Sequence, residues 1–254
     1  MTYFYALALL VGFATLLWLI SLYLKDSSIV DPFWGLLFVG VVWFYFFETE
    51  TGNLNRKWLL TILVTIWGTR LSSYLFWRNW NESEDYRYQN FRKNWGKHYW
   101  WGSWVQVFGL QSFLAWLISY PLYVSQISEA PLNWLDALGV GVWLIGFIFE
   151  AGGDWQLIRF KSNPENKGKL LTTGFWKYTR HPNYFGDSAC WWGYGLIALA
   201  SGSYLQLFAP LLMTFLLLKV SGVAMLERGL KKTKPEYEEY VKKTSAFLPM
   251  SPKK

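Results

Sequence analysis

The chain has 254 residues, of which 53% are hydrophobic, 21% aromatic and only 16% charged. This composition argues against a soluble globular domain and indicates an integral membrane protein. The net charge of +7 is not gathered into a basic module outside the apolar segments, so we expect membrane headgroups or a phosphate-bearing cofactor as partners and no nucleic acid. With one cysteine and two histidines, the chain can form no internal disulfide, and we expect no metal site.

A window of about 19 residues, which spans roughly 30 Å of hydrocarbon, predicts seven membrane helices. They cover residues 3–24, 29–47, 57–77, 105–125, 134–158, 184–200 and 204–226. The first stretch has no basic residue before it and no clear cleavage site, so it is predicted to be a retained helix. Because there is no internal repeat or low-complexity linker, we expect an all-α bundle that forms a single membrane domain over residues 1–254.

The basic residues predict how the bundle is oriented. One side of the predicted membrane carries 20 of the 24 Lys and Arg residues, whereas the other carries only Arg56 and Lys57. The positive-inside rule then places the C-terminus in the cytoplasm and the N-terminus outside. A compact multi-pass chain without an organelle signal fits a bacterial inner membrane.

Polar residues four positions apart recur in three predicted helices. They are Arg70, Tyr74 and Arg78 in the third, Glu150 and Asp154 in the fifth, and Asn183 and Asp187 in the sixth. Residues four apart share one helix face, and charges in hydrocarbon usually face a bundle interior or a wet cavity. All three sets lie near the predicted cytoplasmic ends, so we expect one polar pocket open to the cytosol. The alternative is that they form structural ion pairs.

The segment "FKSNPENKGKLLTTGFWKYTRHPNY" has the composition of an ordered loop that closes over an anion. Its basic residues suit phosphate, while the carboxylates and the amide of the polar sets suit ribose hydroxyls and amides. A nicotinamide dinucleotide carries phosphates as well as ribose hydroxyls and an amide, so it needs both kinds of side chain. No G-x-G-x-x-G follows a strand, and "GVGVWLIG" lies within a helix, where glycines allow close packing. The alternative is a basic loop that is simply solvated.

Three segments carry a family resemblance: "EAGGDWQLIRFK", "TGFWKYTRHPNYFGD" and the tail "LERGLKKTKPEYEEYVKKTSAFLP". Together they resemble the steroid 5-alpha-reductase-like superfamily of membrane proteins, which includes sterol C14 reductases and isoprenylcysteine carboxyl methyltransferases. The resemblance is strongest over residues 135–250, which we expect to be the cofactor-binding half. "VDPFWG", "WGTRLSSYLFWRNW" and "EDYRYQNFRKNWG" look like an uncharacterised branch of the same superfamily.

The resemblance implies an NADPH site that faces the cytosol. The residues that it assigns to the cofactor are Arg70, Tyr74, Arg78, Glu150, Asp154, Lys161, Tyr178, Arg180, Asn183 and Asp187. His181 is added to this set because it lies in the same short segment as Tyr178, Arg180 and Asn183. Reductases often have asparagine where this chain has Glu150 and Arg78. His181 has an alternative role as a helix cap, since Pro182 suits the first turn of a helix.

In steroid reductases a carboxylic acid and a tyrosine polarise the enone carbonyl. The resemblance makes Asp31 the candidate acid. Trp67 stands where the tyrosine is expected, so that role passes to another residue such as Tyr74 or Tyr86. The chain is therefore predicted to be an NADPH-dependent reductase of an activated carbon-carbon double bond in an apolar lipid or steroid-like substrate.

Two other functions stay open. An S-adenosylmethionine-dependent methyltransferase acting on a lipid-like substrate is consistent with "RHPNYFG" and Glu227, although the tail reads "LERGLKK" where that branch has paired glutamates. A non-enzymatic membrane scaffold or transporter would use the polar sets as ion pairs or as a proton path.

Overall fold

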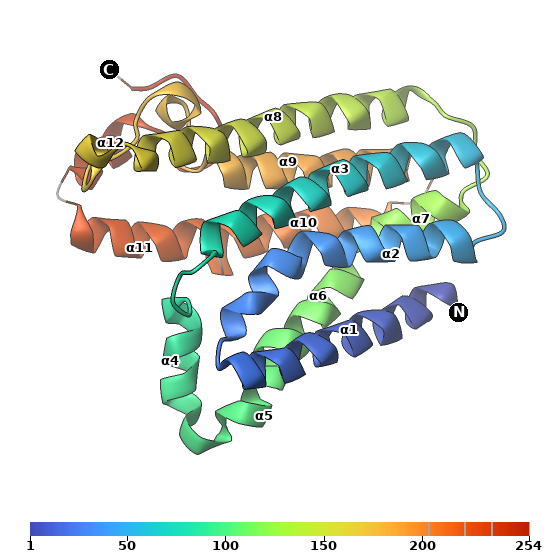
Figure 1. Ribbon diagram of the computed structural model, residues 1–254. Coiled ribbons are helices and arrows are strands. Elements are labelled where there is room, and N and C mark those ends of the chain that lie inside the picture. Colours follow the sequence, from blue (N-terminus) through green and yellow to red (C-terminus); the bar gives the residue numbers. More distant parts are fainter. Residues whose placement is uncertain (203, 221, 235, 254) are drawn as a thin grey trace. The chain divides into compact units, whose positions relative to one another are not determined.

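The computed structural model describes residues 1–202, 204–220, 222–234 and 236–253, and these residues form helices and turns without a strand (Figure 1). The all-α prediction is confirmed. The chain divides into two compact units, Met1–Leu132 and Asn133–Lys254.

Six segments of the described chain are long and apolar enough to cross a membrane. They are Thr2–Leu24, Ser27–Glu48, Leu54–Asn79, Tyr86–Ile127, Trp134–Ser162 and Leu205–Lys231. The predicted helix 184–200 falls on α9 (Pro182–Leu199), which is not among them. Most residues of α9 are buried within the second unit, so α9 can carry polar residues that a lipid-facing helix avoids. The seven-helix count and the sides of the two termini stay predictions.

The first unit contains the helices α1 to α7. Their bounds are α1 (Thr2–Leu24), α2 (Trp34–Glu48), α3 (Leu54–Asn79), α4 (Tyr86–Trp95), α5 (Tyr99–Ser103), α6 (Leu110–Ile118) and α7 (Tyr120–Ile127). A 3-10 helix, Ser27–Phe33, joins α1 to α2, and a π-helical turn, Trp104–Gly109, joins α5 to α6. The predicted span 105–125 is therefore part of a longer, interrupted helical segment.

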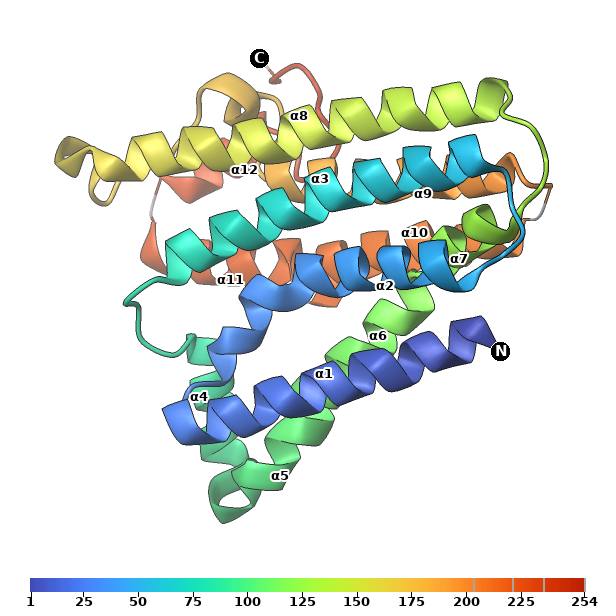
Figure 2. The ribbon, with the colours of Figure 1, turned by 45° about the vertical axis from the view of Figure 1, so that its right-hand side comes forward.

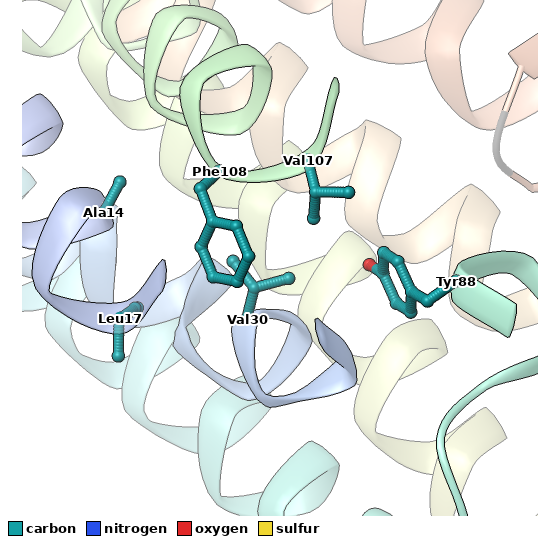
Figure 3. Close-up of a cluster of buried hydrophobic side chains, with 6 residues drawn as sticks. All are labelled: Ala14, Leu17, Val30, Tyr88, Val107 and Phe108. Atoms are coloured by element: carbon teal, nitrogen blue, oxygen red, sulfur yellow. The ribbon is translucent and has the colours of Figure 1, made fainter. Parts of the chain in front are cut away.

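Buried apolar side chains hold α1, α4 and the π-helical turn together. Figure 3 shows this cluster, in which the ring of Tyr88 from α4 extends toward Val30 and Phe108. Elsewhere in this unit, Arg56 is fully buried and donates to the carbonyls of Ala130 (2.7 Å) and Pro131 (3.0 Å). The basic residue Arg56 therefore fixes a loop.

The second unit is built on a long helix, α8 (Trp134–Ser162), which packs along α9 (Figures 1 and 2). Asn133 and Asp136 start α8 with a capping box. The side chain of Asn133 accepts from backbone N–H groups of the first turn, and Asp136 Oδ2 accepts from the backbone N–H of Asn133 at 2.8 Å. The remaining helices are α10 (Phe208–Phe215), α11 (Val223–Thr233) and α12 (Tyr237–Lys243).

Glycines at every seventh position let α8 and α9 touch through their backbones. On α8 these are Gly139, Gly146 and Gly153; on α9 they are Gly186 and Gly193. A Cβ added at Gly146 would lie 2.6 Å from Cys190 N and from Gly186 O. A Cβ at Gly139 would lie 2.7 Å from Gly193 O. The two outer glycines of "GVGVWLIG" therefore allow close packing, as predicted.

We expect Gly146→Ala to destabilise the protein by about 1 to 3 kcal/mol, because the new methyl group collides with backbone that cannot move aside cheaply. Gly141→Ala is the matched control, since a Cβ at Gly141 on the same helix has no neighbour within 4 Å. Thermal unfolding in detergent measures both. Equal melting temperatures for the two variants would contradict this packing.

Candidate functional site

A group of buried polar residues lies where α8 and α9 face each other. Glu150, Asp154 and Asp187 are 2%, 4% and 9% exposed. Gly186 brings α9 against Glu150, because a Cβ at Gly186 would lie 2.3 Å from the Glu150 backbone nitrogen. The structure therefore brings together the residues of two predicted polar sets.

Asn183 connects these two sets directly. Its amide Nδ2 donates to Asp154 Oδ1 at 3.1 Å, and its Oδ1 accepts from the backbone N–H of Tyr184 at 3.1 Å. Asn183 itself is half-buried. These two hydrogen bonds fix the orientation of the amide, so the Asp154–Asn183 pair is a preformed polar contact.

A cavity of about 610 Å³ lies between the last turns of α8 and the loop that follows. Gln156, Arg159, Asn163 and Asn166 are among its lining residues. The loop is ordered by hydrogen bonds, since Asn166 Nδ2 donates to Phe160 O (2.9 Å) and Phe175 N donates to Gln156 Oε1 (2.9 Å). This volume lies within the range of small-molecule sites. Arg159 is exposed there, and Lys161 is exposed on the last turn of α8.

Arg180 is buried and ties three segments together. Its Nε and Nη2 donate to Glu227 Oε1 of α11 at 2.9 and 2.5 Å, and its Nη1 donates to the carbonyl oxygens of Val241 (3.3 Å) and Thr244. Its backbone N–H donates to Ser245 O at 2.9 Å. The guanidinium predicted to meet a cofactor phosphate therefore holds the C-terminal tail against the loop before α9.

His181 and Tyr178 belong to the same region. His181 occupies the N-cap position of α9, but its side chain makes no capping hydrogen bond. Instead its Nε2 lies 3.3 Å from Glu227 Oε1, and its ring stacks on Tyr184. Tyr178 is exposed, and its carbonyl accepts from Met250 N at 2.9 Å. Glu227 is thus the shared acceptor of Arg180 and His181.

Tyr237 of α12 lies beside this ion pair and is 1% exposed. Burial raises the pKa of Tyr237 to about 12, and the negative charge of Glu227 contributes to the rise. The neutral phenol is therefore the form that the folded tail accommodates.

In the first unit, Asp31 is held by two residues that follow the third predicted span. Arg87 Nη2 donates to Asp31 Oδ2 at 2.6 Å, and the Tyr88 hydroxyl donates to Asp31 Oδ1 at 2.5 Å. Arg87 also donates through Nε to Asp85 Oδ1 at 2.9 Å. "VDPFWG" and "EDYRYQNFRKNWG" therefore meet at one carboxylate.

The tyrosine that meets Asp31 is Tyr88, which sequence reasoning did not select. Tyr88 is 4% exposed, whereas Tyr86, two residues earlier, is 55% exposed. Tyr74 lies on α3 with its ring centroid 5.8 Å from the Arg70 guanidinium and 5.7 Å from that of Arg78. These three residues form one face, as their spacing predicts. They lie in the first unit, so a single pocket formed by all three polar sets stays a prediction.

Comparison with known proteins identifies the family. A family model described as a protein of unknown function, DUF1295, matches residues 17–244. The chain is a DUF1295 protein. This family belongs to the steroid 5-alpha-reductase-like superfamily, so the predicted superfamily is confirmed.

Two relatives match different shares of this DUF1295 chain. An uncharacterised protein of Schizosaccharomyces pombe is 25% identical over 281 residues, which covers 96% of this chain and 79% of the relative. The Delta(14)-sterol reductase LBR of Gallus gallus is 33% identical over 98 residues, which covers 33% of this chain and 14% of that reductase. No solved structure matches.

We expect Arg180→Gln to release the C-terminal tail, because it removes one partner of a buried ion pair. The loss of such a partner lowers the folding stability by about 3 to 5 kcal/mol. Limited proteolysis should then cleave within residues 237–253 in the variant and spare them in the wild type. Glu239→Gln is the control, since the Glu239–Lys243 pair is exposed. Equal protection of the tail in all three proteins would contradict this role for Arg180.

The attachment of the tail should also weaken at alkaline pH. The pKa of Tyr237 is about 12 in the folded protein, whereas an unfolded tyrosine titrates near 10. The contribution of its neutral phenol to the stability of the attached tail is therefore complete below about pH 10 and is lost as the pH rises toward about 12. Tyr237→Phe should make tail protection less dependent on pH across this window, whereas Tyr178→Phe should not. An unchanged pH profile in Tyr237→Phe would refute the assignment.

Proposed function

We propose that this protein is a membrane reductase that uses NADPH to reduce an activated carbon-carbon double bond in an apolar lipid or steroid-like molecule. The observation that carries the proposal is the buried polar group on α8 and α9, with the Asp154–Asn183 hydrogen bond at its centre. The local similarity to a Delta(14)-sterol reductase supports the same class of reaction.

The chemistry of the side chains fits a pyridine dinucleotide. Asp154 and Asn183 offer acceptors and a donor for ribose hydroxyls and a carboxamide, while Arg159 lines a cavity large enough for part of a nucleotide and Lys161 adds a nearby charge. We propose that the Asp154–Asn183 pair and the cavity lined by Arg159 hold the cofactor, together with Glu150 and Asp187. NADPH supplies a hydride when it is bound.

Arg180, His181 and Tyr178 then act indirectly. The donors of Arg180 are directed at Glu227 and at tail carbonyls, and His181 faces the same carboxylate. We propose that these residues position the loop before α9 and leave phosphate binding to exposed cations. Arg70, Tyr74 and Arg78 stay proposed cofactor contacts from the first unit.

Asp31 and Tyr88 are the proposed acid pair. The Tyr88 hydroxyl would turn its proton from Asp31 to a substrate carbonyl and stabilise the developing enolate, while the carboxylate of Asp31 stays paired with Arg87. Arg87 holds the other carboxyl oxygen at 2.6 Å, so it orients Asp31 and balances its charge. The substrate would enter from the bilayer, which the candidate spans support. We also propose that the cofactor site faces the cytosol and that the protein lies in a bacterial inner membrane.

The methyltransferase alternative draws less support from this arrangement. Its motif residues Arg180, His181 and Glu227 bind one another, which leaves the carboxylate of Glu227 with fewer free acceptor positions for the sulfonium and amino groups of S-adenosylmethionine. Since the exposed cations near the 610 Å³ cavity suit phosphate better than a cationic methyl donor, we favour the reductase.

We expect Asn183→Ala to weaken NADPH binding by about tenfold, because it removes the amide that hydrogen-bonds Asp154. Asn94→Ala, at an exposed position on α4, is the control. Titration of the purified proteins, followed by cofactor fluorescence, measures the affinity. Unchanged affinity in a folded Asn183→Ala protein would contradict the proposed cofactor site.

The acid pair should affect turnover without affecting cofactor binding. Asp31→Asn and Tyr88→Phe should each lower the rate of substrate-dependent NADPH oxidation by about 100-fold or more, the usual contribution of an acid catalyst. Tyr86→Phe should keep the wild-type rate. If Tyr86→Phe and Tyr88→Phe have the same rate, Tyr88 is not the proton donor.

A further inference from the structure

A second cavity, of about 330 Å³, lies in the first unit at the end of α1. Its walls come from the last turns of α1, the start of the following 3-10 helix, and the segment from the end of α4 into α5. None of its lining residues belongs to the proposed reductase site. It is therefore separate from that site.

Three cations line this cavity. Lys25 and Lys97 are exposed, and neither ammonium group makes a hydrogen bond or ion pair with the described residues. Arg92 donates through Nε and Nη2 to Glu84, at 3.2 and 2.8 Å, while its Nη1 makes no hydrogen bond to the described part of the chain. Glu84 is already shared between Arg92 and the backbone N–H of Ser27. Even with the charges of Glu84 and Asp26 counted, the three cations leave the cavity a net positive charge and donors without partners.

The walls of the cavity are fixed in advance. Lys25 adopts a left-handed backbone conformation (φ 55°) that ends α1, and its carbonyl accepts from Arg92 Nη2 at 3.1 Å. The Arg92 guanidinium lies 4.4 Å from the ring centroid of Tyr99, whose hydroxyl donates to Ser27 Oγ at 2.8 Å. These contacts hold the Arg92 guanidinium and the Tyr99 ring in place, so this part of the wall is ordered before an anion enters.

Apolar and aromatic groups flank the cations. Leu22 belongs to the apolar helix α1, and Trp100 is 59% exposed beside the cavity. Trp18 of α1 donates through its indole N–H to Trp100 O at 2.8 Å. Tryptophan at the end of a membrane span is typical of the headgroup level of a bilayer. The cavity thus combines cations with a surface that suits the start of an acyl chain.

We propose that this cavity binds the phosphate headgroup of an anionic phospholipid. Lysines without partners at the end of a membrane span attract anionic lipids. A soluble phosphate compound offers the same anionic chemistry, but it would leave Leu22 and the exposed face of Trp100 without a partner. This inference is independent of the reductase proposal.

The test uses the full-length protein in mild detergent, with bound lipid measured by native mass spectrometry. Phosphatidylglycerol should bind more tightly than phosphatidylcholine. The double variant Lys25→Gln/Lys97→Gln should weaken phosphatidylglycerol binding by roughly 10- to 30-fold at low ionic strength. The control Lys242→Gln/Lys253→Gln removes the same charge from exposed positions of the second unit and should leave binding unchanged.

Two further arms identify the source of the phosphate. Trp100→Ala should weaken lipid binding, and inorganic phosphate at millimolar concentration should not displace the lipid. Equal binding of the two lipids, or an equal loss in the control pair, would overturn the proposal. Displacement by inorganic phosphate, with no effect of Trp100→Ala, would show a soluble anion site and overturn the lipid assignment.

Discussion

The backbone contact between α8 and α9 is the constraint on which the second unit depends. Gly146 and Gly186 bring the two helices so close that a methyl group at either position would collide with main-chain atoms. This approach sets Asp154 within hydrogen-bonding reach of Asn183 and buries Glu150 and Asp187 beside them. These polar side chains are thus largely buried, where their hydrogen bonds are strong and an unpaired group would be costly.

The Arg180 network extends this constraint to the C-terminal tail. Arg180 lies two residues before the start of α9, and its side chain is satisfied by Glu227 of α11 and by carbonyl groups of the tail. The hydroxyl of Tyr240 donates to the carbonyl of Trp176 in the same loop. The position of Asn183 at the start of α9 is therefore linked to tail residues far along the chain, so the tail supports the site.

Local features were predictable from the sequence, and long-range pairings were not. The spacing of Glu150 and Asp154 places both on one helix face, because helical geometry repeats over short distances. Tyr88 and Asp31 are 57 residues apart, and nothing in the spacing singles out Tyr88 over Tyr86. The carbonyl of Thr244 accepts from Arg180, and a backbone acceptor leaves no trace in residue identity. Hydropathy predicts a span at residues 184–200, but it does not register that most of α9 is buried among its neighbours.

The most direct test of the reductase account is to follow the atom that each cofactor would transfer. The purified protein is incubated with a membrane lipid extract and either NADPH deuterated at the transferable position or S-adenosylmethionine with a labelled methyl group, and the lipids are analysed by mass spectrometry. We expect a saturated lipid that carries one deuterium on carbon, formed by the wild type and lost in Asp31→Asn. A labelled methyl group in the lipid fraction, with no deuterium transferred, would contradict the reductase and establish a methyltransferase.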